Sequence, residues 1–274
     1  MSIETPSALT SHAIHAALAA GDLLRRGFGT HFEIDSKEGK QNYVTQFDKA
    51  AEHSIISHLS HVFPNHAFLA EESGGVESFG STVVWIIDPL DGTVNFARGI
   101  PHFSVSIAAA FQGQVISGVV YQPMLHELFV AEHGHGAYLN GKLLQVSQRK
   151  MLDESFAATG FPYNIDQNPL QAIDRFAEFV EQGLPIRRFG SAALDLAYLA
   201  AGRFDLYWEV GLHPWDMAAG KLLVEEAGGK ISYWNGQFRP LLGYDNILAT
   251  NGHLHEEMVR HLTKKEHWRA HETH

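Results

Sequence analysis

The sequence predicts an α+β protein made of two subdomains that share one continuous body. Its first part begins with two amphipathic helical patterns, which are followed by short apolar strands and an antiparallel meander. After about Ser147 the pattern changes, and short strands alternate with helices. We therefore expect an N-terminal α+β subdomain over residues 1–147 and a C-terminal α/β subdomain over residues 148–274.

Two helices are expected near the N-terminus. The first runs from about Ser7 to Arg26. The second opens at Thr45-Gln46-Phe47-Asp48, which has the form of a capping box, and apolar side chains continue at helical spacing as far as Val62. Asp48 then lies in the first turn, where the helix dipole favours its ionised form.

Short apolar segments predict the strands of the first subdomain. The segment 68–70 leads into Glu71-Glu72, and the segment 83–87 has few polar interruptions, so we expect the latter to be a central strand. Residues 103–111 alternate as a half-buried strand should, and Asn140-Gly141 marks a tight hairpin.

Strands and helices alternate in the second subdomain. We expect helices over 172–181, 191–201 and 216–227. We expect strands over 156–159, 204–209, 231–234 and 246–249.

Composition excludes several classes of function. The 274 residues carry a formal net charge of −11, so the protein is not expected to hold a nucleic-acid backbone by general electrostatics. There is no cysteine, which excludes disulfides, thiolate metal sites and a cysteine nucleophile, and fits a reducing cytoplasm. No signal peptide or transmembrane segment is recognisable, so we expect no membrane partner. Most of the 18 histidines are expected at the surface.

The motif with the clearest chemistry is the run from Asp88 to Thr93. Asp88 and Asp91 stand three residues apart behind an apolar strand, and Gly92-Thr93 follows them directly. Carboxylate oxygens at this place suit Mg²⁺ or Mn²⁺ better than zinc. The backbone N–H groups of Gly92 and Thr93 could face an anion such as phosphate. Alone, the pattern also fits a solvated turn.

Further carboxylates make a solvated turn a less satisfactory explanation of the motif. Glu71 follows another apolar strand, Asp216 opens a helix of small and apolar residues, and Asp48 opens a third element. Carboxylates next to apolar elements are costly to bury unless a cation compensates them. The pattern therefore indicates a shared cation and metal-assisted phosphate chemistry.

These motifs resemble the inositol monophosphatase family of Mg²⁺-dependent, lithium-sensitive phosphatases, in particular its bacterial type. The resemblance covers about residues 13–262 and rests on the segments 69–73, 88–95 and 215–220. It implies a layered αβαβα sandwich of the sugar-phosphatase type, with the site between the two subdomains. Homodimers are common in the family, so a homodimer is expected.

The resemblance also implies a set of metal ligands for two or three Mg²⁺ ions, which Mn²⁺ could replace. One ion would be held by Glu71, Asp88 and the backbone carbonyl of Leu90. A second would be held by Asp88, Asp91 and Asp216. A third, weaker ion would associate near Glu71.

The catalytic residues implied by the family are Thr93, Asp48 and Glu71. Thr93, paired with Asp48, would orient or deprotonate the attacking water, while the N–H groups of Gly92 and Thr93 would hold phosphate oxygens. Lys37 stands where the family often has a mobile-loop lysine near the third metal, although a solvated charge explains it equally well.

The substrate would lie between the two subdomains. Asp91 and Asp216 would contact it, and Glu209 matches the family residue that binds hydroxyl groups. An ordinary rim charge is the alternative for Glu209. Gly190, Ser191 and Ala192 match backbone contacts to the polyol, and Ser191 is equally well explained as a helix N-cap.

The sequence thus predicts a phosphoric monoester hydrolase that acts on inositol monophosphate and related small polyol phosphates. Histidinol phosphate, fructose 1,6-bisphosphate, NADP and 3′-phosphoadenosine 5′-phosphate are alternative substrates within the family. A hypothesis of another class is an additional, non-enzymatic role as a protein partner of transcription or RNA-processing machinery. A Ca²⁺-stabilised protein without turnover fits least well, because the acidic turn lacks the EF-hand pattern.

Overall fold

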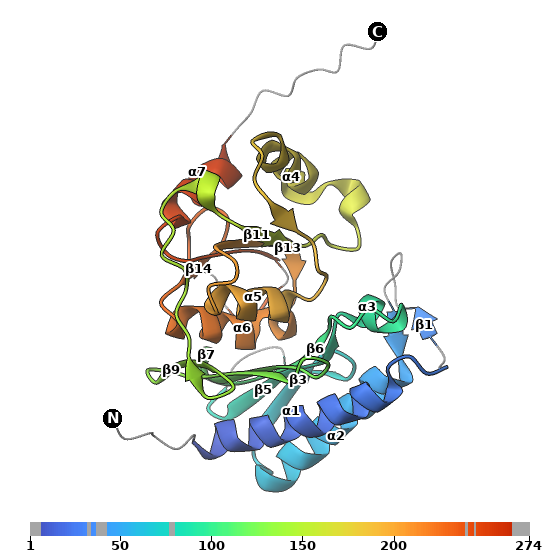
Figure 1. Cartoon of the computed structure of the whole chain (residues 1–274). Coiled ribbons are helices and arrows are strands. Elements are labelled where there is room, and N and C mark those ends of the chain that lie inside the picture. The colour runs from blue at the N-terminus through green and yellow to red at the C-terminus, as the bar shows by residue number, and fades with distance from the viewer. Residues whose placement is uncertain are drawn as a thin grey trace.

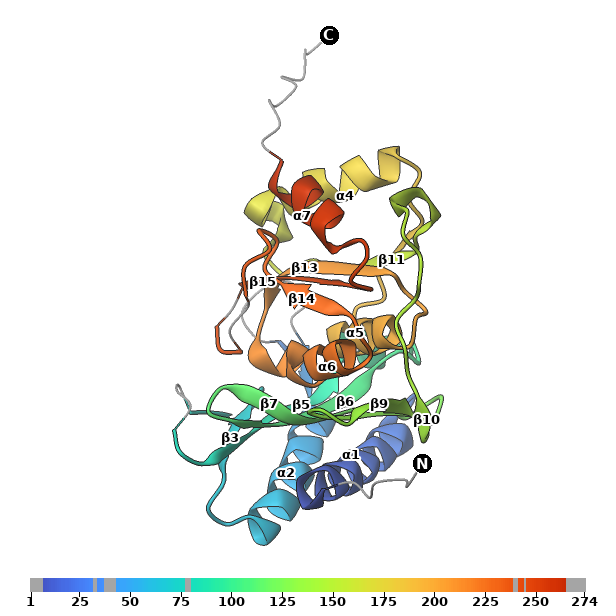
Figure 2. The same cartoon turned by 90° about the vertical axis from the view of Figure 1, so that its left-hand side faces the viewer.

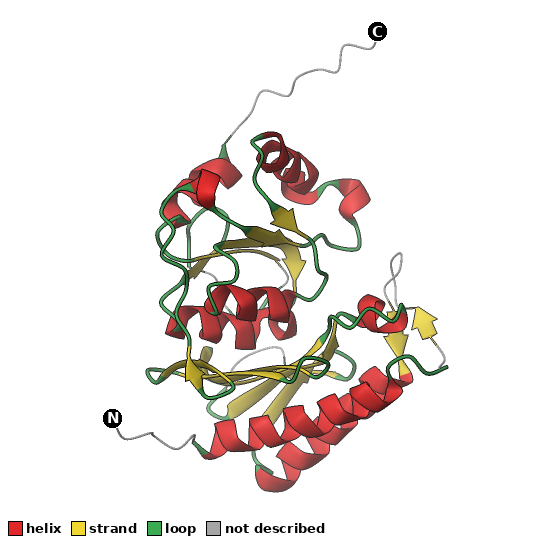
Figure 3. Cartoon of the chain, in the orientation of Figure 1, coloured by secondary structure: helices red, strands yellow, loops and turns green. Residues whose placement is uncertain are grey.

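The computed structural model describes residues 7–31, 34–36, 43–76, 80–238, 241–243 and 245–264. Within these ranges the chain is layered in the order helices, sheet, helices, sheet, helices (Figure 1). Figure 2 shows the same stacking from the side, and Figure 3 shows how helices and strands alternate from layer to layer. The predicted αβαβα fold class is therefore confirmed.

Each helical layer contains a pair of long helices. The pairs are α1 (Ala8–Gly27) with α2 (Gln46–Val62) on the outer face of the first sheet, α5 (Ala192–Ala200) with α6 (Pro214–Glu226) between the sheets, and α4 (Ala172–Glu181) with α7 (His255–Thr263) on the outer face of the second sheet. The helices α1, α2, α4, α5 and α6 begin and end within one residue of their predicted positions, except that α6 begins two residues earlier. No helix was predicted where α7 lies.

The first sheet has eight strands in the order β10-β9-β8-β7-β6-β5-β3-β4. Only β3 and β5 run parallel; the other neighbours are antiparallel, as the predicted meander requires. The strands are β3 (Ala67–Ala70), β4 (Gly74–Gly75), β5 (Val83–Asp91), β6 (Ser104–Phe111), β7 (Gln114–Gln122), β8 (Glu127–Glu132), β9 (Gly136–Leu139) and β10 (Lys142–Leu143).

The second sheet has five strands in the order β12-β11-β13-β15-β14. It is mixed, because β11 runs parallel to β12 and β13, whereas β15 runs antiparallel to β13 and β14. The strands are β11 (Ala157–Thr159), β12 (Ile186–Arg187), β13 (Leu206–Leu212), β14 (Lys230–Ser232) and β15 (Asp245–Thr250). A separate two-stranded sheet, β1 (Ile34–Ser36) and β2 (Tyr43–Thr45), and the short helix α3 (Thr93–Ala97) complete the site end of the first subdomain.

Strand β5 differs from its prediction because it continues through the acidic motif to Asp91. Its register against β6 shifts between Asp88 and Asp91. Pro89 lies in this irregular stretch, which explains how a residue without an N–H group is tolerated in a central strand. The two carboxylates are therefore fixed by the sheet itself, rather than by a turn that follows it.

The expectation that β6 is half-buried is wrong, because both of its faces are covered. Val105 and Ile107 pack with α1 and α2, while Ala108 and Ala110 pack with α5 and α6. The alternation in the sequence is one of side-chain size rather than of polarity. Small side chains on the second face let the central helices lie close to the sheet.

The boundary between subdomains near Ser147 stays a prediction. The last strand of the first sheet ends at Leu143 and the first strand of the second sheet begins at Ala157, with a connecting segment between them. No helix in the described ranges is long and apolar enough to cross a membrane.

Helix α7 begins at a histidine that is buried against the second sheet. His255 is fully buried, with Nε2 at 2.8 Å from Ser232 Oγ and Nδ1 at 3.0 Å from Thr250 Oγ1. Burial lowers the pKa of His255 to about 4, and the positive charge of Lys230 lowers it further, while Glu256 acts in the opposite direction. The folded protein therefore holds this ring in its neutral form at neutral pH.

We expect Gly118→Ala to destabilise the protein by about 1–3 kcal/mol, because overpacking a tight contact costs about this much. A Cβ atom on Gly118 of β7 would lie 3.0 Å from the carbonyl oxygen and 3.1 Å from the Cα of Ala219 in α6. Urea unfolding measures the free energy. Gly80→Ala is the control, since no described atom lies within 4 Å of the position that its Cβ would take. Equal stability of the two variants would contradict this expectation, because it would show that α6 can shift away from β7 without loss of folding free energy.

His255 should weaken the fold as the pH falls from about 6.5 to about 4, because the unfolded chain takes up the proton first. The shift corresponds to a loss of roughly 2–3 kcal/mol, complete near pH 4 and absent above pH 7. His255→Gln removes this titration. Urea unfolding at pH 7.5 and 4.5 should show a smaller loss in His255→Gln than in the wild type or in the exposed control His31→Gln. An equal loss in all three would contradict the assignment.

Candidate active site

The acidic residues predicted for the site lie at the ends of elements from both subdomains. Asp48 is in the first turn of α2, and the predicted capping box is confirmed there. Asp48 Oδ2 accepts hydrogen bonds from Thr45 N at 2.8 Å and from Thr45 Oγ1 at 2.6 Å. The start of α2 thus holds one oxygen of Asp48 in place and leaves Oδ1 directed toward another element.

That other element is α3, which follows β5 directly. Thr93 Oγ1 lies 3.0 Å from Asp48 Oδ1 and 3.0 Å from the carbonyl oxygen of Leu90, so its single proton can be donated to either. Gly92 turns the chain between β5 and α3 with φ of +96°, in the left-handed region. A Cβ there would lie 3.1 Å from the carbonyl oxygen of His102 and 3.3 Å from that of Gly190, so only glycine fits this junction.

Asp91 joins the two subdomains. Its Oδ2 accepts hydrogen bonds from Ser191 Oγ at 2.6 Å and from the backbone N–H of Ala193 at 2.8 Å. Ser191 stands at the N-cap position of α5, but its side chain makes no capping hydrogen bond. The N-cap explanation of Ser191 is therefore incorrect in its usual form: Asp91 of β5 caps the helix from outside, and Ser191 supports Asp91.

Asn95 makes a second connection between the subdomains, which was not predicted from the sequence. Its Nδ2 donates to the carbonyl oxygens of His102 and Phe189, both at 2.8 Å. Phe189 immediately precedes Gly190, so the amide holds the segment before α5 against the loop before β6. The predicted residues Gly190, Ser191 and Ala192 are thereby brought next to Gly92.

The remaining carboxylates follow the same pattern of local fixation. Asp88 Oδ1 accepts from the N–H of Leu90 at 3.0 Å. Asp216 lies in the first turn of α6, where its Oδ2 accepts from the N–H of His213 at 2.7 Å. Glu71 follows β3, and its N–H donates to the carbonyl oxygen of Ile87 on the neighbouring strand at 3.1 Å.

These carboxyl groups act on one another's pKa values. Burial raises the pKa of Asp88 well above its usual range, and the charges of Glu71, Asp91 and Asp216 raise it further. The same holds for Asp216, where burial acts together with Asp91 and Glu71. Burial also raises the pKa of Asp48 and of Asp91 to about 6, against hydrogen bonds that favour their charged forms. The site is therefore an unusual concentration of negative charge in a buried place.

The chemistry of these donors fits a hard divalent cation. They are carboxylate and carbonyl oxygens, and the absence of cysteine leaves no thiolate donor. A cation would offset the repulsion described above. Among the residues that the structure describes, however, no three histidine, aspartate or glutamate side chains already form a group that could hold an ion. The carboxylates are gathered and oriented, but they do not form a finished ligand cage.

Glu209 lies on the side of the cluster formed by the second subdomain. It is a partly buried residue of β13, and Tyr207 donates a hydrogen bond to its Oε2. Burial raises the pKa of Glu209 to about 7, while the Tyr207 hydrogen bond and Arg188 oppose this and Asp91 adds to it. Gly160 makes room for this side chain, since a Cβ there would overlap the Glu209 carboxyl group.

One buried acid of this region was missed. Asp195 of α5 is 1% exposed, and its pKa is raised well above the usual range by burial and then by Glu209 and Asp91. The sequence could have indicated Asp195, because Asp195 is the only charged residue of the apolar segment 192–200. Lys37 lies outside the described residues.

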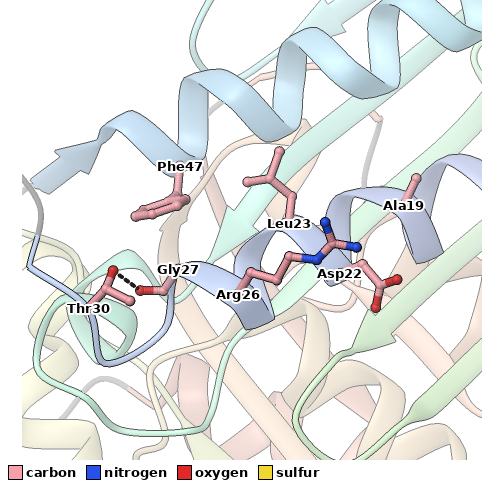
Figure 4. Close-up of a pocket in the computed structure, with 7 residues that line it drawn as sticks. All are labelled: Ala19, Asp22, Leu23, Arg26, Gly27, Thr30 and Phe47. Carbon is pink, nitrogen blue, oxygen red and sulfur yellow. Dashed lines mark hydrogen bonds between the residues drawn. The ribbon is translucent and has the colours of Figure 1, made fainter.

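A pocket of about 420 Å³ lies elsewhere, between α1 and α2 (Figure 4). It is lined by Ala19, Asp22, Leu23, Arg26, Gly27, Thr30 and Phe47. None of these is a predicted site residue, although Phe47 precedes Asp48 in the chain. We assign no ligand to this pocket.

Comparison with known proteins shows the family of the chain. The model of the inositol monophosphatase family matches residues 5–267. The protein named Nus factor SuhB of Escherichia coli (strain K12) is 44% identical over 251 residues, which cover 91% of this chain and 94% of that protein. Inositol-1-monophosphatase of Caulobacter vibrioides is 41% identical over 252 residues, covering 91% and 98% of the two chains.

A solved structure shows the same fold. The crystal structure of extragenic suppressor protein suhB from Bartonella henselae superposes with a TM-score of 0.84 and 41% identity, covering 94% of this chain and 99% of that one. Together with the match of the family model along nearly the whole chain, these similarities establish that the protein belongs to the inositol monophosphatase family.

Proposed function

We propose that the protein hydrolyses inositol monophosphate and related small polyol phosphates to the alcohol and inorganic phosphate. Membership of the family supports a phosphatase, and a relative named inositol-1-monophosphatase supports the substrate. The observation that carries the proposal is the contact of Thr93 Oγ1 with Asp48 Oδ1, at 3.0 Å, beside a cluster of buried carboxylates. A hydroxyl bonded to a fixed carboxylate, next to donors suited to Mg²⁺, is what activation of a water molecule requires.

In this proposal Glu71, Asp88, Asp91, Asp216 and the carbonyl oxygen of Leu90 hold two or three Mg²⁺ ions. Bound Mg²⁺ supplies positive charge for the phosphate and lowers the pKa of water. The ligand carboxylates come from β5, from α6 and from the residue that follows β3, so the first and second subdomains must both be folded for the set to be complete.

The chain's own residues handle the proton and the phosphate. Thr93 accepts a hydrogen bond from the attacking water and donates its own hydroxyl proton to Asp48. The other oxygen of Asp48 is held by Thr45. In this proposal Glu71 is also a catalytic residue and acts on the attacking water. The N–H groups of Gly92 and Thr93 hold phosphate oxygens. Water attacks phosphorus directly while the bond to the alcohol oxygen breaks, and that oxygen takes up a proton from solvent to leave as the alcohol.

The alcohol would lie on the side of the second subdomain. Glu209 accepts hydrogen bonds from the hydroxyl groups of the alcohol. The backbone of Gly190, Ser191 and Ala192 contacts the alcohol. Asp91 and Asp216 contact the substrate as well. Arg188 is the charged group of opposite sign near Glu209. The homodimer and the cytoplasmic location remain predictions.

The name of the relative, Nus factor SuhB, supports a second proposal, that the protein also binds a protein partner in transcription. The net charge of −11 argues against direct binding of RNA and is compatible with a protein contact. Copurification with RNA polymerase, with and without Mg²⁺, tests this role separately from catalysis.

The proposed function is tested by phosphate release from a panel of esters. We expect inositol 1-phosphate and glycerol 2-phosphate to be hydrolysed only with Mg²⁺ or Mn²⁺, and added Li⁺ to inhibit. Histidinol phosphate, fructose 1,6-bisphosphate, NADP and 3′-phosphoadenosine 5′-phosphate complete the panel. A preference of about tenfold or more in kcat/KM for one of these would replace the proposed substrate, since it corresponds to about 1.4 kcal/mol of transition-state binding.

Thr93→Val should lower kcat by about 100-fold or more and leave KM within about threefold, because a proton-transfer group acts in the transition state. Valine keeps the shape and the backbone N–H of Thr93. Thr93→Ser keeps the hydroxyl that reaches Asp48, and it should retain most of the activity. Steady-state phosphate release measures both variants, and comparable loss in Ser and Val would remove the hydroxyl from the mechanism.

A further inference from the structure

Asp195 is a buried carboxylate without a complete set of partners. It lies in the first half of α5, is 1% exposed, and its Oδ1 has no hydrogen-bond partner in the described part of the chain. No ion pair to Asp195 is found among the described residues either. A buried acceptor that is left unpaired costs free energy, and such groups in native proteins call for an explanation.

The position of Asp195 on α5 points it toward the site. Ser191 precedes it by one helical turn, and the N–H of Asp195 donates to the carbonyl oxygen of Ser191 at 3.0 Å. Residues four apart share a face of a helix, and helical side chains lean toward the N-terminal end. The same end of α5 supplies Ser191 Oγ and Ala193 N–H to Asp91. The Asp195 carboxyl group therefore lies over the turn that meets Asp91.

Glu209 reaches this place from the other side. It comes from β13, its Oε2 is bonded to Tyr207, and it fills the space that the missing side chain of Gly160 leaves. Its negative charge acts on Asp195, as does that of Asp91, while the exposed Arg188 has the opposite effect. Two carboxyl groups thus come from two elements, α5 and β13, next to the strand end that carries Asp91.

We propose that Asp195 is a specificity-determining residue that accepts a hydrogen bond from a second hydroxyl group of the substrate's alcohol, opposite Glu209. The inference rests on the proposed function and narrows its substrate class to esters of alcohols with at least two further hydroxyl groups. A hydroxyl donor satisfies the buried Oδ1 without bringing a charge, whereas an ester without hydroxyl groups leaves it unpaired. An ester without hydroxyl groups therefore binds with the free-energy cost of an unpaired acceptor. This cost makes the enzyme discriminate strongly against such esters.

The test compares inositol 1-phosphate with phenyl phosphate, which carries no hydroxyl group. In the Mg²⁺-loaded enzyme we expect Asp195→Ala to lower the ratio of kcat/KM for inositol 1-phosphate to that for phenyl phosphate by about tenfold, the size expected for the loss of one hydrogen bond. Most of the change should be a rise in KM for inositol 1-phosphate. Asp195→Asn keeps a neutral acceptor oxygen and should show a smaller change in the same direction. Asp153→Asn, an exposed acid on the same subdomain, is the control.

Thermal unfolding without Mg²⁺ separates this role from a purely structural one. Asp195→Asn replaces a carboxyl group that lies among other carboxylates, so the Tm of this variant should equal that of the wild type or exceed it. An unchanged substrate ratio, an equal loss for both esters, or a fall in Tm would each overturn the assignment. Turnover of neither ester by the wild type with Mg²⁺ would instead reject the proposed function, and with it this inference.

Discussion

The site depends on one interaction, the capture of Asp91 by the start of α5. Strand β5 belongs to the first sheet and α5 to the layer between the sheets, so a buried carboxylate of one subdomain satisfies the helix end of the other. An unpaired charge in this place would be costly, and so would an uncapped helix N-terminus. Each requirement is met by the other, and the junction holds the start of α5 against the strand that carries Asp88 and Asp91.

The layered fold explains how several carboxylates reach one place. Parallel strands β3 and β5 end side by side and present Glu71, Asp88 and Asp91, while the first turns of α2 and α6 present Asp48 and Asp216. Both helix starts hold one carboxylate oxygen with their own N–H groups, where the dipole also favours negative charge. Repulsion between the acids remains, and it is this stored unfavourable energy that a divalent cation would relieve.

The sequence predicted the fold well where pattern and local chemistry agree, and less well where tertiary contacts decide. The capping box of α2 and the helices α4, α5 and α6 could be predicted because their signals are local, whereas α7 was not predicted. The burial of β6 could not, since small residues on its second face look alike whether they are covered or exposed until the position of α6 is known. The same limit applies to Ser191 and Asp195, whose surroundings depend on distant parts of the chain. Whether the Ser191 hydroxyl caps its own helix or donates to Asp91 depends on a residue that is a hundred positions away in the chain.

The two hydrogen bonds of Asn95 constrain how the molecule can move. Its amide connects the loop before β6 with the segment before α5, a few residues from the junction at Asp91. A hinge motion that swung one half of the molecule away from the other would have to break both of these bonds as well as those of Asp91. We therefore expect ligands to enter and leave while the two halves stay together, and any gating to come from shorter segments at the rim.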